Sequence, residues 1–249
     1  MLLMLLRCCY DLLKKGAQMP DIYAIIPARG GSKRIENKNI TLINSSPMIG
    51  VTIKTLLGIA SLKSVIVSTD SEQISHVSLE FGASCPFIRP SDLSDDYTST
   101  LDVMKHALQT LDSISENDLV MCVYPTAVLL TAEIYESAIR MSFQINLSNQ
   151  FLVSVAKYSH PIERALKMDP ESKIKFIRPH FAKTRTQDLV ASYFDAGQFY
   201  ISTKSNWLNS ESVLENGYGF EISKYSFIDI DYPEDIEEVR RRVGWTTPP

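Results

Sequence analysis

A short stretch near the start of the chain combines backbone freedom with positive charge. The apolar run 22–26 is followed by Arg29, two glycines, Ser32, Lys33 and Arg34. Glycine lets a backbone approach a ligand closely or adopt positive φ, and successive N–H groups in such a turn form an anion-binding concavity. The three cations add mobile positive charge. These residue types at this spacing favour a loop that grips phosphates.

The loop matches neither of the common phosphate-binding motifs. Its glycines, Gly30 and Gly31, are adjacent. A Walker loop requires G-x-x-x-x-G-K-[ST], and the dinucleotide fingerprint requires G-x-G-x-x-G before a helix. A P-loop ATPase and a dehydrogenase are therefore disfavoured. An ordinary turn with solvated charges is the plain alternative, but cations clustered directly after an apolar strand favour phosphate binding.

A pair of carboxylates near the end of the chain offers a second kind of chemistry. Asp229 and Asp231 lie in the alternating stretch 227–231, which we predict to be a strand with both carboxylates on one face. Such carboxylates repel unless a cation or protons lie between them. Oxygen ligands suit Mg²⁺, so we predict Mg²⁺ here, with Mn²⁺ as a substitute. The alternative is that Asp231 partly caps a helix beginning at Pro233.

Strand-like and helical segments alternate along the chain. Continuous apolar strands between helices predict an α/β fold with a mainly parallel sheet covered on both faces. Ligands gather at the carboxyl ends of such strands. The phosphate loop, Asp70, Tyr124 and Asp231 all follow predicted strands, which favours one shared site. The predicted strands include 22–26, 64–68 and 119–124, and the predicted helices are 48–57, 101–111, 132–143 and one from Pro233.

The bulk composition excludes several classes of protein. At 249 residues with 45% hydrophobic content, the chain can bury a full core. The net charge of −4 gives no general attraction to nucleic acid or to an anionic membrane. Four cysteines without C-x-x-C spacing indicate neither a zinc site nor a disulfide framework. Cys85 and Cys122 lie in apolar runs, so we expect them to be free thiols in the core of a protein of the reducing cytoplasm.

We expect one main domain, residues 19–249, preceded by an extension. The apolar run at residues 1–6 is too short for a signal peptide or a membrane span, so residues 1–18 are predicted to be dispensable. The pattern loosens at about 156–191, a basic stretch that we interpret as an excursion from the sheet. A solvated basic loop is the alternative.

The phosphate loop carries a family resemblance. Ala28 to Arg34, followed by Lys38 and Asn39, resembles the signature of the CMP-sialate synthetases, also called acylneuraminate cytidylyltransferases. The likeness covers about residues 22–243, and residues 195–200 resemble the pseudaminic acid branch rather than the ordinary sialic acid branch. Further matches follow in the family's order at 68–70, 89–90, 124–127 and 228–231.

The resemblance implies a Rossmann-like, GT-A type nucleotidyltransferase fold and a set of site residues. It implies that Arg29 and Lys33 balance charge on the CTP phosphates, and that Asp229 and Asp231 hold the metal. It also implies that the excursion reaches across a homodimer to the partner's sugar pocket. The implied substrate-binding residues are Ala28, Gly30, Gly31, Ser32, Lys38 and Asn39 at the phosphates, Arg89, Thr98 and Thr100 around the base, and Tyr124, His160, Arg185 and Gln198 on the sugar side.

The implied reaction is transfer of CMP from CTP to the anomeric hydroxyl of a nonulosonic acid, with release of pyrophosphate. Pseudaminic acid is the first expectation, in the cytoplasm, for glycosylation of surface glycans or flagellin. Legionaminic, N-acetylneuraminic or another 3-deoxy keto sugar acid is the alternative acceptor. A non-catalytic nucleotide-binding regulator ranks lower, because the loop cations and the aspartate pair are both present. No general base stands out.

Overall fold

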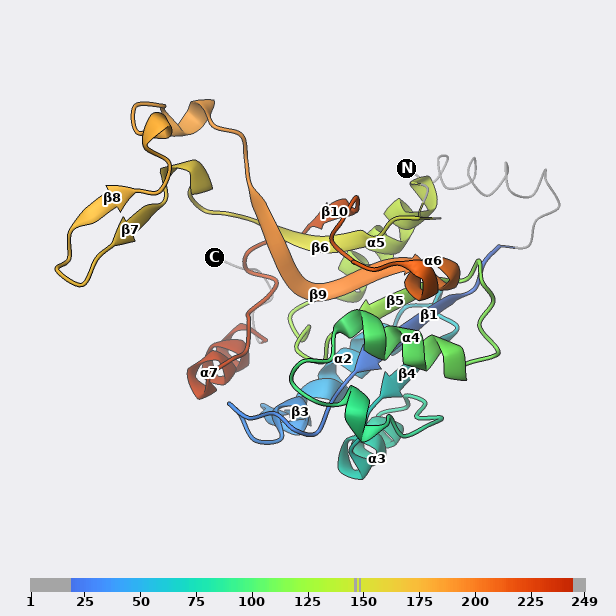
Figure 1. Ribbon diagram of the computed structural model, residues 1–249. Coiled ribbons are helices and arrows are strands. Elements are labelled where there is room, and N and C mark those ends of the chain that lie inside the picture. Colours follow the sequence, from blue (N-terminus) through green and yellow to red (C-terminus); the bar gives the residue numbers. More distant parts are fainter. Residues whose placement is uncertain (1–18, 146, 148, 244–249) are drawn as a thin grey trace.

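A six-stranded sheet runs through the molecule in the order β10-β6-β9-β5-β1-β4 (Figure 1). The computed structural model describes residues 19–145, 147 and 149–243. The predicted extension, residues 1–18, lies outside the described residues. The strands are β1 (Ile22–Pro27), β4 (Ser64–Ser68), β5 (Leu119–Val123), β6 (Leu152–Lys157), β9 (Tyr193–Thr203) and β10 (Tyr218–Glu221).

The predicted mainly parallel α/β sheet is confirmed. Strand β1 pairs in parallel with both β4 and β5, and β10 pairs in parallel with β6. Strand β9 runs antiparallel to β5 and to β6, so it joins the two parallel groups. The predicted strand 119–124 ends at Val123, and the other predicted strands of the parallel group agree within one residue.

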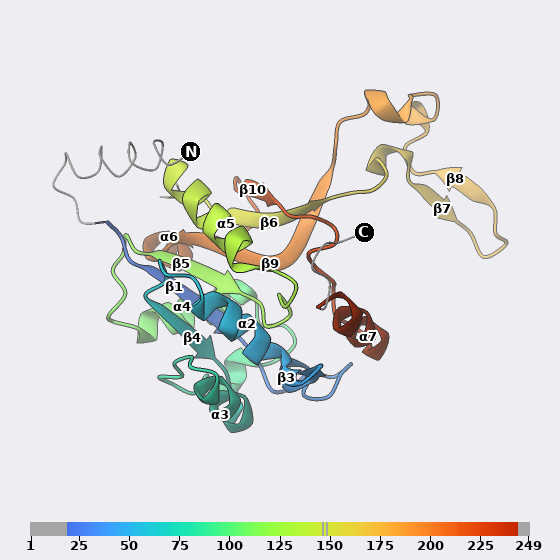
Figure 2. The same cartoon turned by 180° about the vertical axis from the view of Figure 1, so that it is seen from behind.

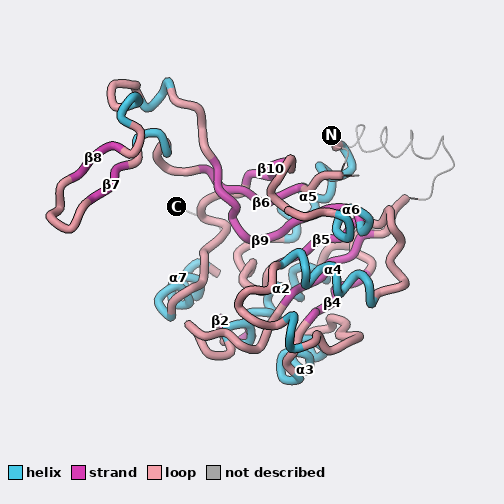
Figure 3. Tube along the Cα trace, in the orientation of Figure 1, coloured by secondary structure: helices cyan, strands magenta, loops and turns pink. Residues whose placement is uncertain are grey.

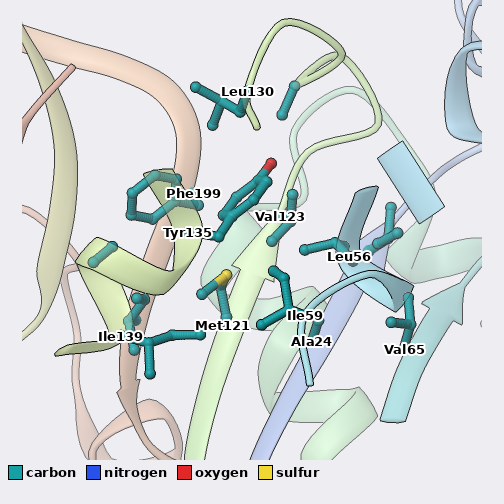
Figure 4. Close-up of a cluster of buried hydrophobic side chains, with 14 of the residues drawn as sticks. Ala24, Leu56, Ile59, Val65, Met121, Val123, Leu130, Tyr135, Ile139 and Phe199 are labelled. Atoms are coloured by element: carbon teal, nitrogen blue, oxygen red, sulfur yellow. The ribbon is translucent and has the colours of Figure 1, made fainter. Parts of the chain in front are cut away.

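Helices cover both faces of the sheet, as the views from opposite sides show (Figures 1 and 2). The alternation of β1 explains this: Ile22, Ala24 and Ile26 join one buried cluster, while Tyr23 and Ile25 join the other. The first cluster is closed by α2 (Met48–Leu57), α3 (Glu72–Glu80) and α5 (Ala132–Gln144), and Figure 4 shows part of it; the second is closed by α4 (Thr100–Thr110) and α6 (Lys204–Asn209).

A third, smaller cluster attaches the end of the chain beside the phosphate loop. Helix α7 (Pro233–Arg242) begins where predicted and buries Ile236 and Val239. These pack with Ile230 and with Met48 at the start of α2. The cluster also includes Ile43, which comes from the small hairpin of β2 (Leu42–Ile43) and β3 (Ser46–Pro47) that follows the 3-10 turn η1 (Lys38–Ile40).

The predicted strand at 227–231 is wrong. These residues have irregular backbone, although Ile230 is buried and Ile228 is half-buried. The alternation of apolar and acidic residues therefore arises because the apolar side chains pack into the third cluster, and these residues pair with no strand.

The chain leaves the sheet between β6 and β9 and forms an arm. Its tip is a two-stranded hairpin of β7 (Leu166–Met168) and β8 (Ile174–Phe176), and the rest is loop with short helices η3 (Ile162–Arg164), η4 (Pro179–Phe181) and η5 (Thr186–Asp188). The arm projects away from the sheet in every view (Figures 1, 2 and 3). Met168 and Ile174, opposite each other in the hairpin, are 70% and 62% exposed.

Two findings bear on the bulk expectations. Cys122 is buried and Cys85 is half-buried, both as free thiols. Within the described part of the chain, the helices lack the length and apolar character needed to cross a bilayer.

Candidate active site

A cleft of about 410 Å³ opens where β1 and β5 end. Its wall gathers residues from five segments of the sequence. The carboxyl ends of the parallel strands β1 and β5 meet at this edge of the sheet, as expected for a ligand site in such a fold. Besides predicted residues the wall includes Leu93, Val103 and Gly197. The predicted site residues that line it are Arg29, Ser32, Lys38, Asn39, Arg89, Thr98, Thr100, Tyr124 and Asp229.

The phosphate loop is fixed by hydrogen bonds in which its backbone N–H groups donate and one of its carbonyls accepts. The buried Ala28 donates its N–H to the Ser68 carbonyl at 2.9 Å. The Gly30 N–H donates to Asp70 Oδ1 at 2.9 Å, and Nδ2 of the buried Asn39 donates to the Arg29 carbonyl at 2.9 Å. The loop backbone is therefore held in place before a ligand binds, and Ala28 and Asn39 contribute through these hydrogen bonds that fix the backbone.

The two glycines serve the loop differently from the expectation. Among the described glycines, Gly82 and Gly197 have positive φ. Gly30 and Gly31 do not, so the loop does not use glycine for that conformation. A Cβ on Gly30 would lie 3.0 Å from the Ser71 Cβ, which is the close approach that requires glycine there. A Cβ on Gly31 would meet no atom within 4 Å.

The loop cations hold an internal carboxylate. Arg29 Nη1 lies 2.7 Å from Asp96 Oδ1 and donates to the Asp95 carbonyl at 2.7 Å. Lys33, whose side chain is 80% exposed, forms an ion pair with the other Asp96 oxygen. Hydrogen bonds from Lys33 and Arg29 hold the pKa of the Asp96 carboxyl below its usual value. Asp96 thus gives these two cations an anionic partner in the described chain.

A buried cation forms part of the cleft wall. Arg89 is only 3% exposed; its Nε donates to Ser94 Oγ at 3.1 Å, and its Nη2 lies 3.7 Å from Asp70 Oδ1. Burial lowers the pKa of Arg89, and the Asp70 carboxylate acts against that shift. A desolvated guanidinium gains strongly from a ligand acceptor, and Arg89 can supply a rigid pair of donors.

The aspartate pair lies beside Lys38 and Arg34. Lys38 Nζ donates to the Ile230 carbonyl at 2.6 Å. Burial lowers the Lys38 pKa, while the charges of Asp231 and Asp229 act against this, so both carboxylates are within electrostatic reach of the ammonium. Arg34 Nη1 lies 2.7 Å from Asp231 Oδ2. Asp229 lines the cleft, whereas Asp231 faces Arg34 and is not among the lining residues.

The capping alternative for Asp231 is wrong. The N-cap is Tyr232, and Asp235 in the first turn completes a capping box, because its Oδ2 accepts the N–H of Asp231 at 2.8 Å and of Tyr232 at 2.7 Å. The Asp231 carboxylate is therefore free of the helix. Among residues 19–145, 147 and 149–243, no three acidic, histidine or cysteine side chains group closely enough to hold a metal ion.

In the turn before α4, one residue caps the helix and its two neighbours line the cleft. Ser99 is the N-cap and accepts the Asp102 N–H at 3.1 Å. This leaves Thr98 and Thr100 at the cleft, where Thr98 Oγ1 donates to Asp95 Oδ1 at 2.6 Å. Thr100 Oγ1 shares a hydrogen bond with Tyr124 Oη. The residues expected around the base and on the sugar side therefore meet at this point.

The sugar-side position of Gln198 differs from the expectation. Gln198 is buried, and its Nε2 donates to the carbonyls of Ala196 at 2.8 Å and Gly197 at 3.1 Å. Its Oε1 has no hydrogen-bond partner in the described chain. The neighbour Gly197, with φ of +58°, lines the cleft instead. A bulge in β9 thus presents backbone rather than the Gln198 amide.

The structure does not bring His160 and Arg185 to the cleft. Both lie on the arm, where His160 is exposed and Arg185 pairs with Asp188, Nε to Oδ2, at 2.8 Å. Sequence reasoning assigned no role to Asp95 and Asp96, which line the cleft and engage Arg29. The signal available was an acidic pair directly before the threonines of the α4 turn.

Comparisons with known proteins agree with this geometry. The family model described as cytidylyltransferase matches residues 23–210. A pseudaminic acid cytidylyltransferase of Campylobacter jejuni is 36% identical over 215 residues, which are 86% of this chain and 92% of that protein. An N-acylneuraminate cytidylyltransferase of Escherichia coli is 29% identical over 217 residues, which are 87% of this chain and 50% of that protein.

A solved structure shares the fold. It is a CMP:2-keto-3-deoxy-manno-octonic acid synthetase complexed with CTP. The match has a TM-score of 0.66 and 18% sequence identity, and it covers 89% of this chain and 97% of the other.

Proposed function

The chain belongs to the cytidylyltransferase family, and we propose that it transfers CMP from CTP to the anomeric hydroxyl of a nonulosonic acid and releases pyrophosphate. Pseudaminic acid is the proposed acceptor, because the relative with 36% identity is named a pseudaminic acid cytidylyltransferase. The observation that carries the proposal is one cleft that joins the loop cation Arg29, the buried Arg89 and the Asp229 carboxylate.

The proposed reaction depends on positioning and charge neutralisation. The sugar hydroxyl attacks the α-phosphorus, a P–O bond forms, and the bond to pyrophosphate breaks. Such transfers need little covalent chemistry from the protein. Arg29 and Lys33 would release Asp96 and neutralise the phosphates, while Ser32, which lines the cleft, would orient them. Arg89 would fix the base through its buried donors.

We propose a divalent cation at the aspartate pair. Mg²⁺ commonly takes one or two carboxylates and completes its octahedron with water and substrate phosphate, so the set of Asp229 and Asp231 fits it without a third acidic side chain. When bound, Mg²⁺, or Mn²⁺ in its place, would polarise the phosphate oxygens. Asp231 would exchange its ion pair with Arg34 for the metal.

We propose that the working form is a cytoplasmic homodimer built through the arm. The arm exposes apolar side chains at its hairpin, including Met168 and Ile174. It also carries His160 and Arg185 away from the cleft of its own chain. Two copies exchanging arms would cover the apolar hairpin and offer these polar side chains to the partner's sugar acid.

The experiment is a pyrophosphate-release assay with CTP and a panel of acids. Pseudaminic acid should give at least about tenfold higher kcat/KM than legionaminic, N-acetylneuraminic or another 3-deoxy keto acid, since a site built for polar groups rejects analogues lacking them. A different preferred acid would reassign the substrate within the family. CTP binding without turnover of any acid would favour the nucleotide-binding regulator instead.

A further inference from the structure

The end of β4 supports two walls of the cleft at once. Ser68, Thr69 and Asp70 follow one another there. The Ser68 carbonyl accepts the Ala28 N–H of the phosphate loop at 2.9 Å, and the Thr69 carbonyl accepts the Arg89 N–H at 2.8 Å. Successive carbonyls of a strand point to opposite sides. One strand end therefore holds the start of the phosphate loop on one side and Arg89 on the other.

The Asp70 side chain joins the same two walls through a single oxygen atom. Its Oδ1 accepts the Gly30 N–H at 2.9 Å and lies 3.7 Å from Nη2 of Arg89. The Arg89 side chain is 3% exposed, so solvent screens this ion pair less than a pair on the surface. Asp70 is not among the residues that line the cleft. It therefore acts on both walls from behind them.

The two walls face different halves of the proposed nucleotide. Arg29, next to Gly30 in the loop, lines the cleft and would meet the triphosphate, whereas Arg89 lines it and would meet the base. Because one oxygen serves both walls, a phosphate that fixes the Gly30 backbone also fixes the oxygen that Arg89 faces. A hydrogen-bonded connection of this kind can carry coupling between two sites. The Asp70 charge also stabilises the charged guanidinium against burial.

We propose that Asp70 is a positioning residue that couples the two halves of the nucleotide site, so that a triphosphate in the loop tightens binding of the base beside Arg89. The inference rests on the proposed function. Thermodynamic linkage requires the reverse effect to have the same size, so the base also tightens binding of the triphosphate. The coupling favours a complete nucleotide over either of its halves.

The test offers the two halves of the nucleotide to the full chain as separate ligands. Cytidine is titrated calorimetrically into the protein with and without saturating inorganic tripolyphosphate. Tripolyphosphate should lower the cytidine dissociation constant by about fivefold or more, the usual size of coupling between sites. Cytidine should lower the dissociation constant of tripolyphosphate by the same factor. A factor close to one in the unaltered protein would overturn the inference without any variant.

Two substitutions ask whether Asp70 carries the coupling. Asp70→Asn keeps an oxygen for the Gly30 N–H and removes the charge facing Arg89, so it should lower the coupling factor. Asp70→Ala removes both contacts and should abolish the coupling.

The matched control is Asp118→Asn. The buried Asp118 carboxylate accepts two backbone N–H groups, at 2.9 and 2.7 Å, directly before β5 and so at the opposite end of that strand from the cleft. Thermal unfolding is recorded for every variant. The control should lose stability and keep the coupling factor, which separates support of the fold from positioning. An unaltered factor in folded Asp70→Ala would overturn the inference.

Because these titrations require no turnover, they separate this inference from the proposed function. Coupled binding of cytidine and tripolyphosphate that Asp70→Ala abolishes would support the inference even in a protein that transfers no CMP. Transfer of CMP by a protein that binds the two half-ligands independently would leave the function standing and remove the inference.

Discussion

Asp96 Oδ1 lies 2.7 Å from Nη1 of Arg29, so a cation expected to meet the substrate phosphates already holds an anion of its own chain. The second oxygen of Asp96 engages Lys33 in the same way. In the proposed function both cations turn to a triphosphate, so Asp96 would compete with the substrate while keeping the cations near its binding place.

We expect Asp96→Asn to tighten CTP binding. Removing the charge frees Arg29 and Lys33 without changing the shape of the loop, and exposed ion pairs have modest strength, so the KM for CTP should fall by about threefold to fivefold. Steady-state kinetics at low salt measures it. Asp92→Asn, in the short 3-10 helix at residues 91–93 that precedes Asp96, is the control and should leave KM unchanged. A raised KM in Asp96→Asn would show that the carboxylate mainly positions the cations.

We expect Lys33→Ala to lower turnover by about 10²-fold or more, the usual loss when a charge-stabilising group is removed. The fold should survive, because the Lys33 side chain is 80% exposed. Thermal unfolding and kcat are measured together. Lys63→Ala, which removes an ion pair with Asp21 beside the start of β1, should keep full turnover. Near-normal kcat in folded Lys33→Ala would contradict the phosphate-loop assignment.

Chelation should abolish activity, and Mg²⁺ or Mn²⁺ should restore it. Asp229→Asn should raise the Mg²⁺ concentration for half-maximal rate by about tenfold or more, since even outer-shell changes weaken metal sites by that factor. Glu234→Gln, an exposed acid close by in the sequence, is the control. Full activity after exhaustive chelation would remove both Asp229 and Asp231 from a metal role.

Stability should fall steeply at alkaline pH. Burial raises the pKa of Tyr124 and Tyr200 above that of an unfolded tyrosine, so the folded state binds more protons and its stability declines as pH rises above about 10. Urea unfolding between pH 8 and 11 measures the slope, which each such group steepens by up to about 1.4 kcal/mol per pH unit. Tyr200→Phe should flatten it, whereas Tyr97→Phe, at a 93% exposed site, should not. Equal slopes in both variants would contradict the raised pKa of Tyr200.

Charge on the arm hairpin should weaken the proposed dimer. Met168→Asp combined with Ile174→Asp places two carboxylates at directly paired positions of β7 and β8. The dimer dissociation constant should rise by about tenfold or more, as expected for apolar anchors of an interface. Light scattering during gel filtration reports the mass. Leu79→Asp, at an exposed site on α3, should leave the mass unchanged. A dimer that survives the double substitution would place the interface elsewhere.

Local pattern was enough to predict the parallel half of the fold. Helix α2 and strand β4 have the predicted bounds, because apolar spacing reports directly which face of an element is buried. Strand β9 was not predicted, since its antiparallel pairing joins residues separated by the whole arm. Periodicity within a short window carries no information on such pairing.

The site shows the same division between local and non-local information. The phosphate loop could be placed at a strand end because it directly follows β1, whereas Thr100 was assigned to the same cleft only through the family resemblance. Gln198 could not, because the bulge at Gly197 reverses which residue of β9 faces the cleft. The Asp96 ion pairs depend on a loop folding back over Arg29, which no spacing in the sequence encodes.

The pairing of β6 with β9 at the base of the arm has a consequence for how such proteins can diversify. Strands β6 and β9 are in register at Lys157 and Tyr193, so the arm enters and leaves the domain at adjacent points. For a loop anchored in this way, doubling the length adds only about 0.6 kcal/mol of closure entropy. The arm can therefore lengthen, shorten or change its sequence while the cleft keeps its geometry. In the proposed dimer, sequence changes on the arm would alter subunit recognition and acceptor preference without disturbing the cleft that handles the nucleotide.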